Sequence, residues 1–182
     1  VEDLFYFAEN DRIVKVSMAD SVKKIEDQVF QYFHNLSEIQ LSKNLESIGE
    51  EAFYECTSLK KISLPEKITE IKAMTFHDCS LLEEVELSDS GNLKKIDDFA
   101  FSGCESLKKI NIPEGVTDIG NSAFENTALT EITIPDSITN ISYDIFQGCE
   151  NLTSIIWKGQ TYNSASEFFG AFKTAYLEKN TK

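Results

Sequence analysis

The chain of 182 residues has little of what catalysis and nucleic-acid binding require. It contains two histidines, four cysteines and one tryptophan, and 17 basic residues stand against 31 acidic ones, for a formal net charge of -14. A negative field of this size repels phosphate groups, so we expect neither nucleic acid nor anionic lipid as a partner. No apolar run approaches the roughly 20 residues that a membrane helix needs, so we also expect no membrane insertion.

The first residues lack the pattern of a secretory signal. The chain begins at Val1 rather than Met, and residues 1–10 have no basic segment followed by an apolar one. We expect that a signal peptide has been removed or was never present. The composition as a whole, 41% hydrophobic and 26% charged, is that of a folded domain rather than a disordered chain.

A repeat of about 23 residues organises most of the chain. Residues 48–65 (IGEEAFYECTSLKKISLP) return as residues 96–113 (IDDFAFSGCESLKKINIP). The repeat starts fall at Ile25, Ile48, Ile71, Ile96, Ile119 and Ile141. A seventh, degenerate unit begins near Glu2, where Phe7 takes the position that Phe30 holds in the next unit. A fixed period of this length is typical of a solenoid, in which each unit packs on its neighbours.

Two columns of the repeat indicate its core. The fifth residue after every start is phenylalanine, which predicts an equivalent buried slot in each unit: Phe30, Phe53, Phe76, Phe101, Phe124 and Phe146. The eighth residue is cysteine in four units: Cys56, Cys79, Cys104 and Cys149. We interpret these as buried free thiols, because parallel ladder side chains keep Cβ atoms farther apart than a disulfide prefers. A Cys56–Cys79 or Cys79–Cys104 disulfide stays an alternative, as does a metal or redox role, although no CxxC motif occurs.

Later in each unit, apolar pairs such as Ile62 and Leu64 alternate with polar residues, which is the period-two pattern of a half-buried strand. The outward positions of these strands form the candidate binding surface: Lys15, Ser17, Glu38, Gln40, Lys61, Ser63, Glu84, Glu86, Lys109, Asn111, Glu131 and Thr133. These outward positions form two columns, one at the start and one at the end of each strand. In the first column the charge alternates in sign from unit to unit: Lys15, Glu38, Lys61, Glu84, Lys109 and Glu131. The alternation has two interpretations, namely neutralisation between neighbouring strands or a flat, mixed-charge platform for a protein ligand.

The last 20 or so residues break the repeat. Ser164 and Glu167 have the spacing of a capping box, and the aromatic residues that follow recur on one helical face: Phe168, Phe169, Phe172 and Tyr176. The pattern predicts an amphipathic helix over about residues 164–179 that closes the end of the stack. A helix that binds a partner is the alternative.

These patterns divide the chain into two parts. Residues 1–163 form the repeat solenoid, in which residues 1–24 are a degenerate first repeat or cap. Residues 164–182 form the capping helix and its tail. Within the solenoid, the unit at residues 71–95 is two residues longer than most, and the segment 88–92 (SDSGN) follows its strand. Such a loop is either a tolerated insertion or a recognition element.

The consensus Ile-Gly-x-x-Ala-Phe-x-x-Cys-x-x-Leu-x-x-Ile-x-Ile/Leu-Pro resembles the BspA-like class of leucine-rich repeats over about Glu2–Asn163. The unit at residues 25–47 departs most, with Phe33 in the cysteine column and Ser42 in place of proline. The resemblance implies an α/β repeat solenoid, a right-handed superhelix of about seven turns with a parallel β-sheet on its concave side. It further implies secreted or surface proteins of host-associated bacteria, often adhesins, whose protein ligand differs between members.

Residues that could carry chemistry are scattered. His34 and His77 occupy different phases of the repeat and have no metal-ligand spacing to another histidine or cysteine. Acidic pairs such as Glu83 and Glu84 lack the surrounding pattern of a calcium loop. We therefore expect no catalytic, metal or cofactor-binding residues.

The sequence as a whole favours a non-enzymatic protein-binding module of a bacterial cell-surface or secreted protein. Adhesion or interaction with a host protein is the expected role, and a monomer is the expected state. The alternative is a structural spacer, a segment of a larger surface protein that holds another domain away from the envelope.

Overall fold

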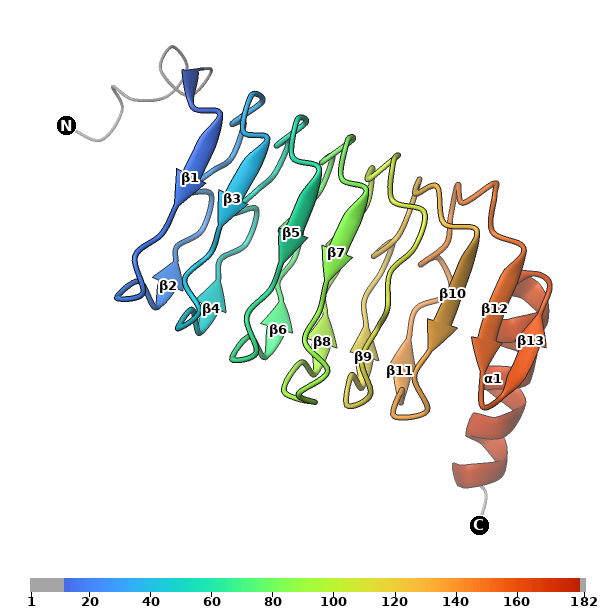
Figure 1. Ribbon diagram of the computed structural model, residues 1–182. Coiled ribbons are helices and arrows are strands. Elements are labelled where there is room, and N and C mark those ends of the chain that lie inside the picture. The colour runs from blue at the N-terminus through green and yellow to red at the C-terminus, as the bar shows by residue number, and fades with distance from the viewer. Residues whose placement is uncertain (1–11, 181–182) are drawn as a thin grey trace.

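The structure, a computed structural model, describes residues 12–180, with side chains as far as residue 178. The chain winds into a solenoid of stacked repeats that ends in one helix (Figure 1). The six units from Ile25 onward are described in full, whereas Glu2 and Phe7 of the degenerate unit lie outside the described residues. The repeat solenoid that the 23-residue period predicts is confirmed.

Each unit except the one at residues 96–118 contributes one longer strand to a row that faces the viewer in Figure 1. These strands are β1 (Lys15–Ser17), β3 (Glu38–Gln40), β5 (Lys61–Ser63), β7 (Glu84–Glu86), β10 (Glu131–Ile134) and β12 (Ser154–Trp157). Paired neighbours run parallel with equivalent residues opposite one another, as Lys61 is to Glu84. Because side chains alternate across a strand, Ile62 is buried between exposed Lys61 and Ser63. We call the outer side of this row the long-strand face.

The row is interrupted twice, so the single continuous sheet expected from the sequence is replaced by shorter sheets. β1 pairs with β3, β5 with β7, and β10 with β12, with no ladder between these groups in residues 12–180. Residues 109–111, expected to be a strand, form only an isolated bridge between Asn111 and Thr133. The first break lies beside the unit that departs most from the consensus, and the second follows the lengthened unit. Both breaks thus border units that depart from the consensus in sequence or in length.

A second row of two-residue strands begins each repeat, and the sequence patterns did not predict it. The strands are β2 (Lys24–Ile25), β4 (Ser47–Ile48), β6 (Glu70–Ile71), β8 (Lys95–Ile96), β9 (Asp118–Ile119) and β11 (Asn140–Ile141). β2 pairs with β4, and the other four form one parallel sheet in the order β11-β9-β8-β6. Two residues are too few to produce an alternating pattern, so only the stacking of units reveals these strands.

The phenylalanine column forms the centre of the core. Phe53, Phe76, Phe101 and Phe124 are 0% exposed. From Phe30 to Phe124 the rings stack nearly parallel, with centroids 5.2 to 5.7 Å apart. The ladder is looser at its ends, because Phe30 is only half-buried and the last step, to Phe146, widens to 6.5 Å.

The cysteines line a second ladder beside the phenylalanines, and all four are free thiols. Each sulfur donates a hydrogen bond to the phenylalanine carbonyl of the preceding unit, for example Cys56 to Phe30 at 3.1 Å. Burial raises the pKa of the Cys56 thiol to about 12, and it also raises the pKa values of Cys79, Cys104 and Cys149. The ladder therefore consists of neutral thiols that join one unit to the next.

A third column adopts the left-handed backbone conformation. The seventh residue after each start has φ between 54° and 75°: Tyr32, Glu55, Asp78, Gly103, Asn126 and Gly148. A Cβ atom on Gly103 would lie 1.9 Å from Asp78 Oδ1, and one on Gly148 would lie 1.9 Å from Asn126 Oδ1. From Asp78 onward, a residue with a side chain therefore alternates with a glycine that leaves room for it.

The stack ends in a hairpin and a helix. β13 (Gln160–Tyr162) returns antiparallel to β12 through Lys158 and Gly159, both left-handed. The helix α1 (Ala165–Asn180) begins as the capping box predicts, since Glu167 N donates to Ser164 Oγ at 3.2 Å. Glu167 also accepts a hydrogen bond from the backbone N–H of Asn163 at 3.0 Å. The sequence therefore marks the start of α1 to within one residue.

The aromatic face of α1 covers the last turn only in part. Phe168 is 0% exposed, and its ring lies edge-on to Trp157 with centroids 5.9 Å apart. Phe169 contacts Phe146, the last ring of the ladder, at 6.4 Å. Tyr176, which the pattern placed on the same face, is 53% exposed, because α1 runs past the edge of the turn that it covers.

Candidate functional site

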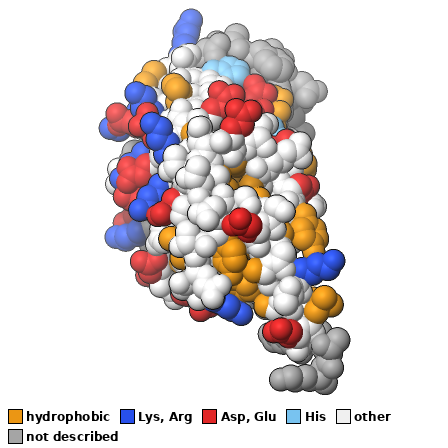
Figure 2. All heavy atoms as spheres, turned by 90° about the vertical axis from the view of Figure 1, so that its right-hand side faces the viewer, with side chains coloured by type: hydrophobic (Ala, Val, Ile, Leu, Met, Phe, Trp, Pro, Cys, Tyr) orange, Lys and Arg blue, Asp and Glu red, His pale blue; other side chains and the backbone are white. Residues whose placement is uncertain are grey.

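All the residues expected to form the binding surface lie exposed on the long-strand face: Lys15, Ser17, Glu38, Gln40, Lys61, Ser63, Glu84, Glu86, Lys109, Asn111, Glu131 and Thr133. Basic and acidic side chains gather along the left-hand edge of Figure 2, which is the face that Figure 1 shows from the front. A hollow of about 610 Å³ lies over its first three strands, with Gln40, Lys61 and Ser63 among its lining residues. The repeat thus brings side chains that are distant in sequence onto one surface.

Part of the charge alternation is neutralised between paired strands. Lys15 Nζ lies 2.6 Å from Glu38 across β1 and β3. Lys61 Nζ lies 3.1 Å from Glu84 and 2.7 Å from Glu86 across β5 and β7. These ion pairs raise the pKa of Lys61 and lower that of Glu86, to which the Ser63 hydroxyl also donates a hydrogen bond. Neutralisation therefore accounts for the alternation wherever the strands are paired.

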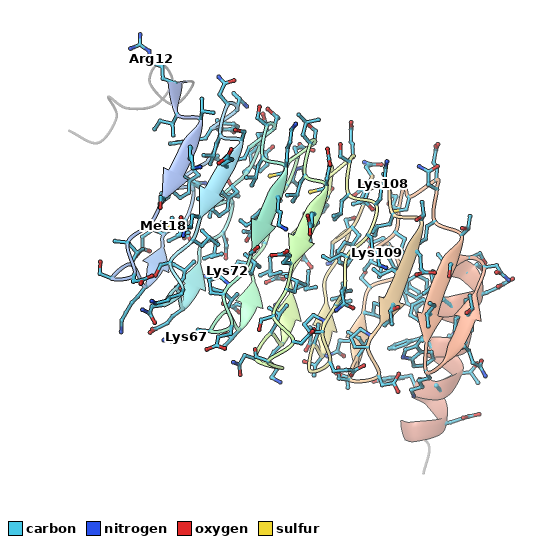
Figure 3. All side chains as sticks on the ribbon, viewed as in Figure 1. Arg12, Met18, Lys67, Lys72, Lys108 and Lys109 are labelled. Atoms are coloured by element: carbon cyan, nitrogen blue, oxygen red, sulfur yellow. The ribbon has the colours of Figure 1, made fainter. Side chains whose placement is uncertain are left out.

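Neutralisation stops where the row is interrupted. Lys108 and Lys109 lie on the unpaired segment between β7 and β10 (Figure 3), and neither forms an ion pair with any described residue. Lys60 and Glu83, on the neighbouring units, likewise form no ion pair within the part of the chain that the structure describes. The middle strands of the row and the residues just before them therefore carry four exposed charges that form no ion pair among the described residues: Lys60, Glu83, Lys108 and Lys109.

The opposite side of the repeat, between the short strand and the cysteine, carries a row of aromatic rings. The contacting rings are Tyr32, His34, Tyr54, His77 and Phe99. Tyr54 stacks on His77 with centroids 5.1 Å apart, whereas Tyr32 meets Tyr54 edge-on at 5.5 Å. The sequence interpretation treated the histidines as isolated. The signal it missed is that Tyr54 and His77 share one phase of the repeat.

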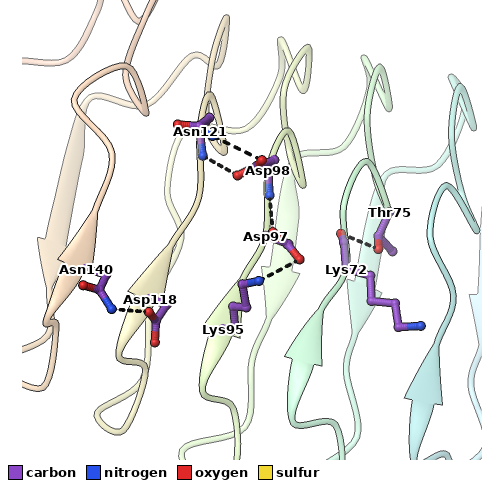
Figure 4. A network of polar contacts seen from close by, with 8 residues as sticks. All are labelled: Lys72, Thr75, Lys95, Asp97, Asp98, Asp118, Asn121 and Asn140. Carbon is purple, nitrogen blue, oxygen red and sulfur yellow. Dashed lines mark hydrogen bonds and ion pairs between the residues drawn. The ribbon is translucent and has the colours of Figure 1, made fainter.

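A network of polar contacts joins the short strands (Figure 4). Asp98 accepts hydrogen bonds from the backbone N–H and the side-chain amide of Asn121, at 2.7 and 3.2 Å. Asp118 accepts one from Asn140 Nδ2 at 2.5 Å, and hydrogen bonds from Thr117 and Asn140 lower its pKa. Asp98 and Asp118 thus connect successive units through hydrogen bonds.

The inserted segment 88–92 is held against the preceding unit. Ser90 Oγ and Asn92 Nδ2 both donate to the carbonyl oxygen of Glu66, at 3.3 and 2.9 Å. Gly91 has φ of 73°, which suits the tight turn at the tip. These contacts give the loop a defined shape, whichever of its two proposed roles applies.

A groove of about 540 Å³ lies between α1 and the last short strands, on the end of the molecule that faces the viewer in Figure 2. Its apolar lining includes Tyr143, Phe172, Tyr176 and Leu177. Tyr143 is the most exposed of these, at 68%. The groove was not predicted, because it depends on where α1 crosses the stack.

Neither a metal-binding group of side chains nor a membrane-spanning helix is found among the described residues. No group of three or more histidine, cysteine or acidic side chains in residues 12–180 is placed to hold a metal ion. Within the same part of the chain, no helix combines the length and apolar character that a membrane span needs. The long-strand face and the groove beside α1 are the two candidate binding surfaces.

Comparisons with known proteins agree with this geometry. The family model described as BspA type leucine rich repeat region matches residues 3–92 and 82–180. A leucine-rich repeat protein from Bacteroides ovatus ATCC 8483 is 30% identical, with a TM-score of 0.62, over 79% of this chain. The T. pallidum leucine-rich repeat protein is 28% identical, with a TM-score of 0.75, over 80% of this chain. A comparison with curated proteins finds no match.

The matched structures are longer than this chain. It spans 33% of the Bacteroides ovatus chain and 70% of the T. pallidum chain. The pneumococcal vaccine antigen PcpA shares the fold at 20% identity and a TM-score of 0.53, over 80% of this chain and 51% of its own. The family resemblance of the repeat consensus is confirmed, and the chain belongs to the BspA-type leucine-rich repeat family.

Proposed function

We propose that this chain is a non-enzymatic protein-binding module of a bacterial cell-surface or secreted protein, which acts in adhesion or in binding a host protein. The ligand is a protein that docks on the long-strand face. The family supports this role, since leucine-rich repeats generally serve as binding scaffolds rather than catalysts.

One observation carries the proposal. Along the long-strand face, exposed residues change from unit to unit, while the residues beneath them are nearly constant: a serine, a glutamate, an asparagine and a threonine occupy one outward column at Ser63, Glu86, Asn111 and Thr133. The fold does not fix the residues of this exposed column, so a ligand can determine them. Variable residues on a rigid scaffold are typical of recognition surfaces.

A structural spacer is the second candidate, and the length of the relatives favours it. The chain covers only a third of the Bacteroides ovatus structure, so it could correspond to one segment of a longer protein. In that case the ion pairs from Lys15 to Glu38 and from Lys61 to Glu84 would serve only to stabilise the stack.

A pull-down from host extracellular-matrix and serum proteins tests the proposal. The bait proteins are the wild type, a Ser63→Trp/Asn111→Trp variant and a control with tryptophan at exposed Glu105, on the aromatic side of the repeat. Retained proteins are identified, and their affinities are then measured with purified components. Circular dichroism melts establish that all three baits are equally folded.

The outcomes separate the candidates. A ligand retained by the wild type and the control but lost by the double variant supports binding on the long-strand face. Retention by all three baits moves the site to the groove beside α1, whereas loss by the Glu105 control alone moves it to the aromatic row. If nothing is retained, the spacer becomes the leading function.

A further inference from the structure

We propose that the middle of the long-strand face binds an α-helix of the partner, lying along the solenoid axis, with an acidic, a basic and an acidic residue on successive turns. This inference rests on the proposed function and specifies the chemistry of its ligand. The surface involved is a set of six residues, which we call the banded patch: Lys60, Lys61, Glu83, Glu84, Lys108 and Lys109.

The banded patch consists of three bands of like charge. Two lysines in one unit are followed by two glutamates in the next and by two lysines in the third, and all six residues are exposed. Cross-strand neutralisation explains only the contact between Lys61 and Glu84. The charges of Lys60, Glu83, Lys108 and Lys109 stay without counter-ions among the described residues.

The break in the sheet keeps the last band unpaired. β5 and β7 are in register, so the Lys60 carbonyl accepts hydrogen bonds from the backbone N–H groups of Glu83 and Glu84. No ladder joins β7 to residues 109–111 within the described part of the chain, and Lys109 is not drawn toward Glu84. Figure 3 shows Lys108 and Lys109 on this segment. Both lysines can therefore contact a partner without losing an existing ion pair.

The charge on the aromatic side of the repeat also favours the long-strand face for an acidic group of the partner. The segments between the short strand and the cysteine position carry Lys72 as their only lysine and the following acids: Glu26, Asp27, Glu50, Glu51, Glu55, Asp78, Asp97, Asp98, Glu125 and Asp144. That side repels an acidic partner. The long-strand face balances its glutamates with lysines, so an acidic side chain is repelled less there than on the aromatic side.

The spacing of the bands indicates a helix rather than an extended segment. Successive units are separated by the step of the phenylalanine ladder, 5.3 Å from Phe53 to Phe76 and 5.4 Å from Phe76 to Phe101. An α-helix advances about 5.4 Å per turn, so residues i, i+4 and i+7 meet the three bands in register. Side chains on one face of a strand repeat at roughly 6.6–6.8 Å and fall out of register by the third band.

Model peptides of about 20 residues test the inference, since shorter helices are marginal in water. The probe is an alanine-based helix with Glu, Lys and Glu at i, i+4 and i+7. One control peptide inverts the charges to Lys, Glu and Lys, and a second keeps the probe's charges but has a central proline that breaks the helix. Binding is measured by fluorescence anisotropy at low ionic strength and by NMR shifts of backbone amides.

Two protein variants with the same change in net charge accompany the wild type. Lys108→Glu/Lys109→Glu alters the banded patch, whereas Lys67→Glu/Lys72→Glu alters two lysines off the face, also labelled in Figure 3. We expect the wild type to prefer the probe over the inverted peptide by about fivefold to tenfold. The patch variant should lose this preference and the off-face variant keep it, and salt of about 1 M should abolish it.

Three results would overturn the inference: equal binding of probe and inverted peptide, equal losses in both variants, or undiminished binding of the proline peptide. If no peptide binds although the wild type captures a protein that the Ser63→Trp/Asn111→Trp variant loses, the helix is wrong and the proposed function stands. If neither the peptides nor any protein binds, both fail.

Discussion

The phenylalanine ladder and the long-strand face are built by the same repeat, yet they follow opposite rules. In the ladder one residue type recurs at every unit, its rings stack at 5.2 to 5.7 Å, and the four interior rings are 0% exposed. On the long-strand face the residues change at every unit and remain exposed. Units of identical shape need identical interiors but place no demand on the side chains that point to water. Positions that are constant from unit to unit therefore stabilise the stack, whereas variable positions are those that can determine which ligand binds.

The largest expected effect comes from the ladder. Phe76→Ala removes a ring stacked on both sides, at 5.3 Å from Phe53 and 5.4 Å from Phe101. We expect the free energy of unfolding to fall by about 3–5 kcal/mol, measured by urea denaturation. Tyr143→Ala, at a site 68% exposed, is the control and should change it little. A loss of under about 1 kcal/mol for Phe76→Ala would contradict the role of the ladder.

The cysteine ladder gives a pH-dependent effect. The raised pKa of Cys56, from 9.0 to about 12, means that the thiol stays protonated in the folded chain while it ionises in the unfolded one. This contribution is complete below about pH 9 and is lost as the pH rises toward 12, by up to about 1.4 kcal/mol per pH unit. Comparing melts of the wild type and Cys56→Ala across this range isolates the effect. Parallel pH profiles in the two proteins would show that Cys56 makes no such contribution.

The left-handed column gives a smaller loss. Gly103→Ala puts a Cβ atom in a strained conformation and against Asp78 Oδ1, and we expect about 1–3 kcal/mol of destabilisation. Gly159→Ala is matched, with φ of 71° but no atom within 4 Å of the added Cβ, and measures the backbone strain alone. Adding Asp78→Ala to Gly103→Ala should restore part of the difference. Equal losses at both glycines would mean that the contact with Asp78 is unimportant.

The smallest effect on stability comes from the long-strand face. Lys61→Gln removes ion pairs with Glu84 and Glu86, but exposed pairs contribute little to folding. We expect an unchanged thermal melt together with altered binding of whichever protein the pull-down identifies. A clearly lowered melting temperature would instead favour neutralisation as the main purpose of these charges, and with it the spacer.

The stacked repeats and the outward positions of the long-strand face could both be predicted from the sequence. The 23-residue period predicted the stack, the alternation around Ile62 predicted β5, and Ser164 with Glu167 predicted the start of α1. Each of these is a local pattern repeated or capped in a recognisable way. The outward positions of the long-strand face followed directly from the strand periodicity, although what they bind did not.

The features that the sequence did not predict depend on contacts between neighbouring units. The short strands span two residues each and have no pattern of their own, and the break after β7 reflects a mismatch between neighbouring units. The groove beside α1 requires the crossing position of the helix, which no local signal specifies. The turn at Lys158 and Gly159 could have been predicted from the sequence, because a two-residue segment ending in glycine between strands is a hairpin signal.

The alternation of side chains and glycines in the left-handed column also limits how the gene for such an array can change. Losing one unit, for example residues 96–118, would place Asp78 next to Asn126, where two side chains would compete for the space that a glycine now leaves free. Losing the two consecutive units at residues 96–140 would instead bring Asp78 beside Gly148, which again has no side chain. In this part of the array, recombination should therefore preserve folding more readily when units are gained or lost in pairs.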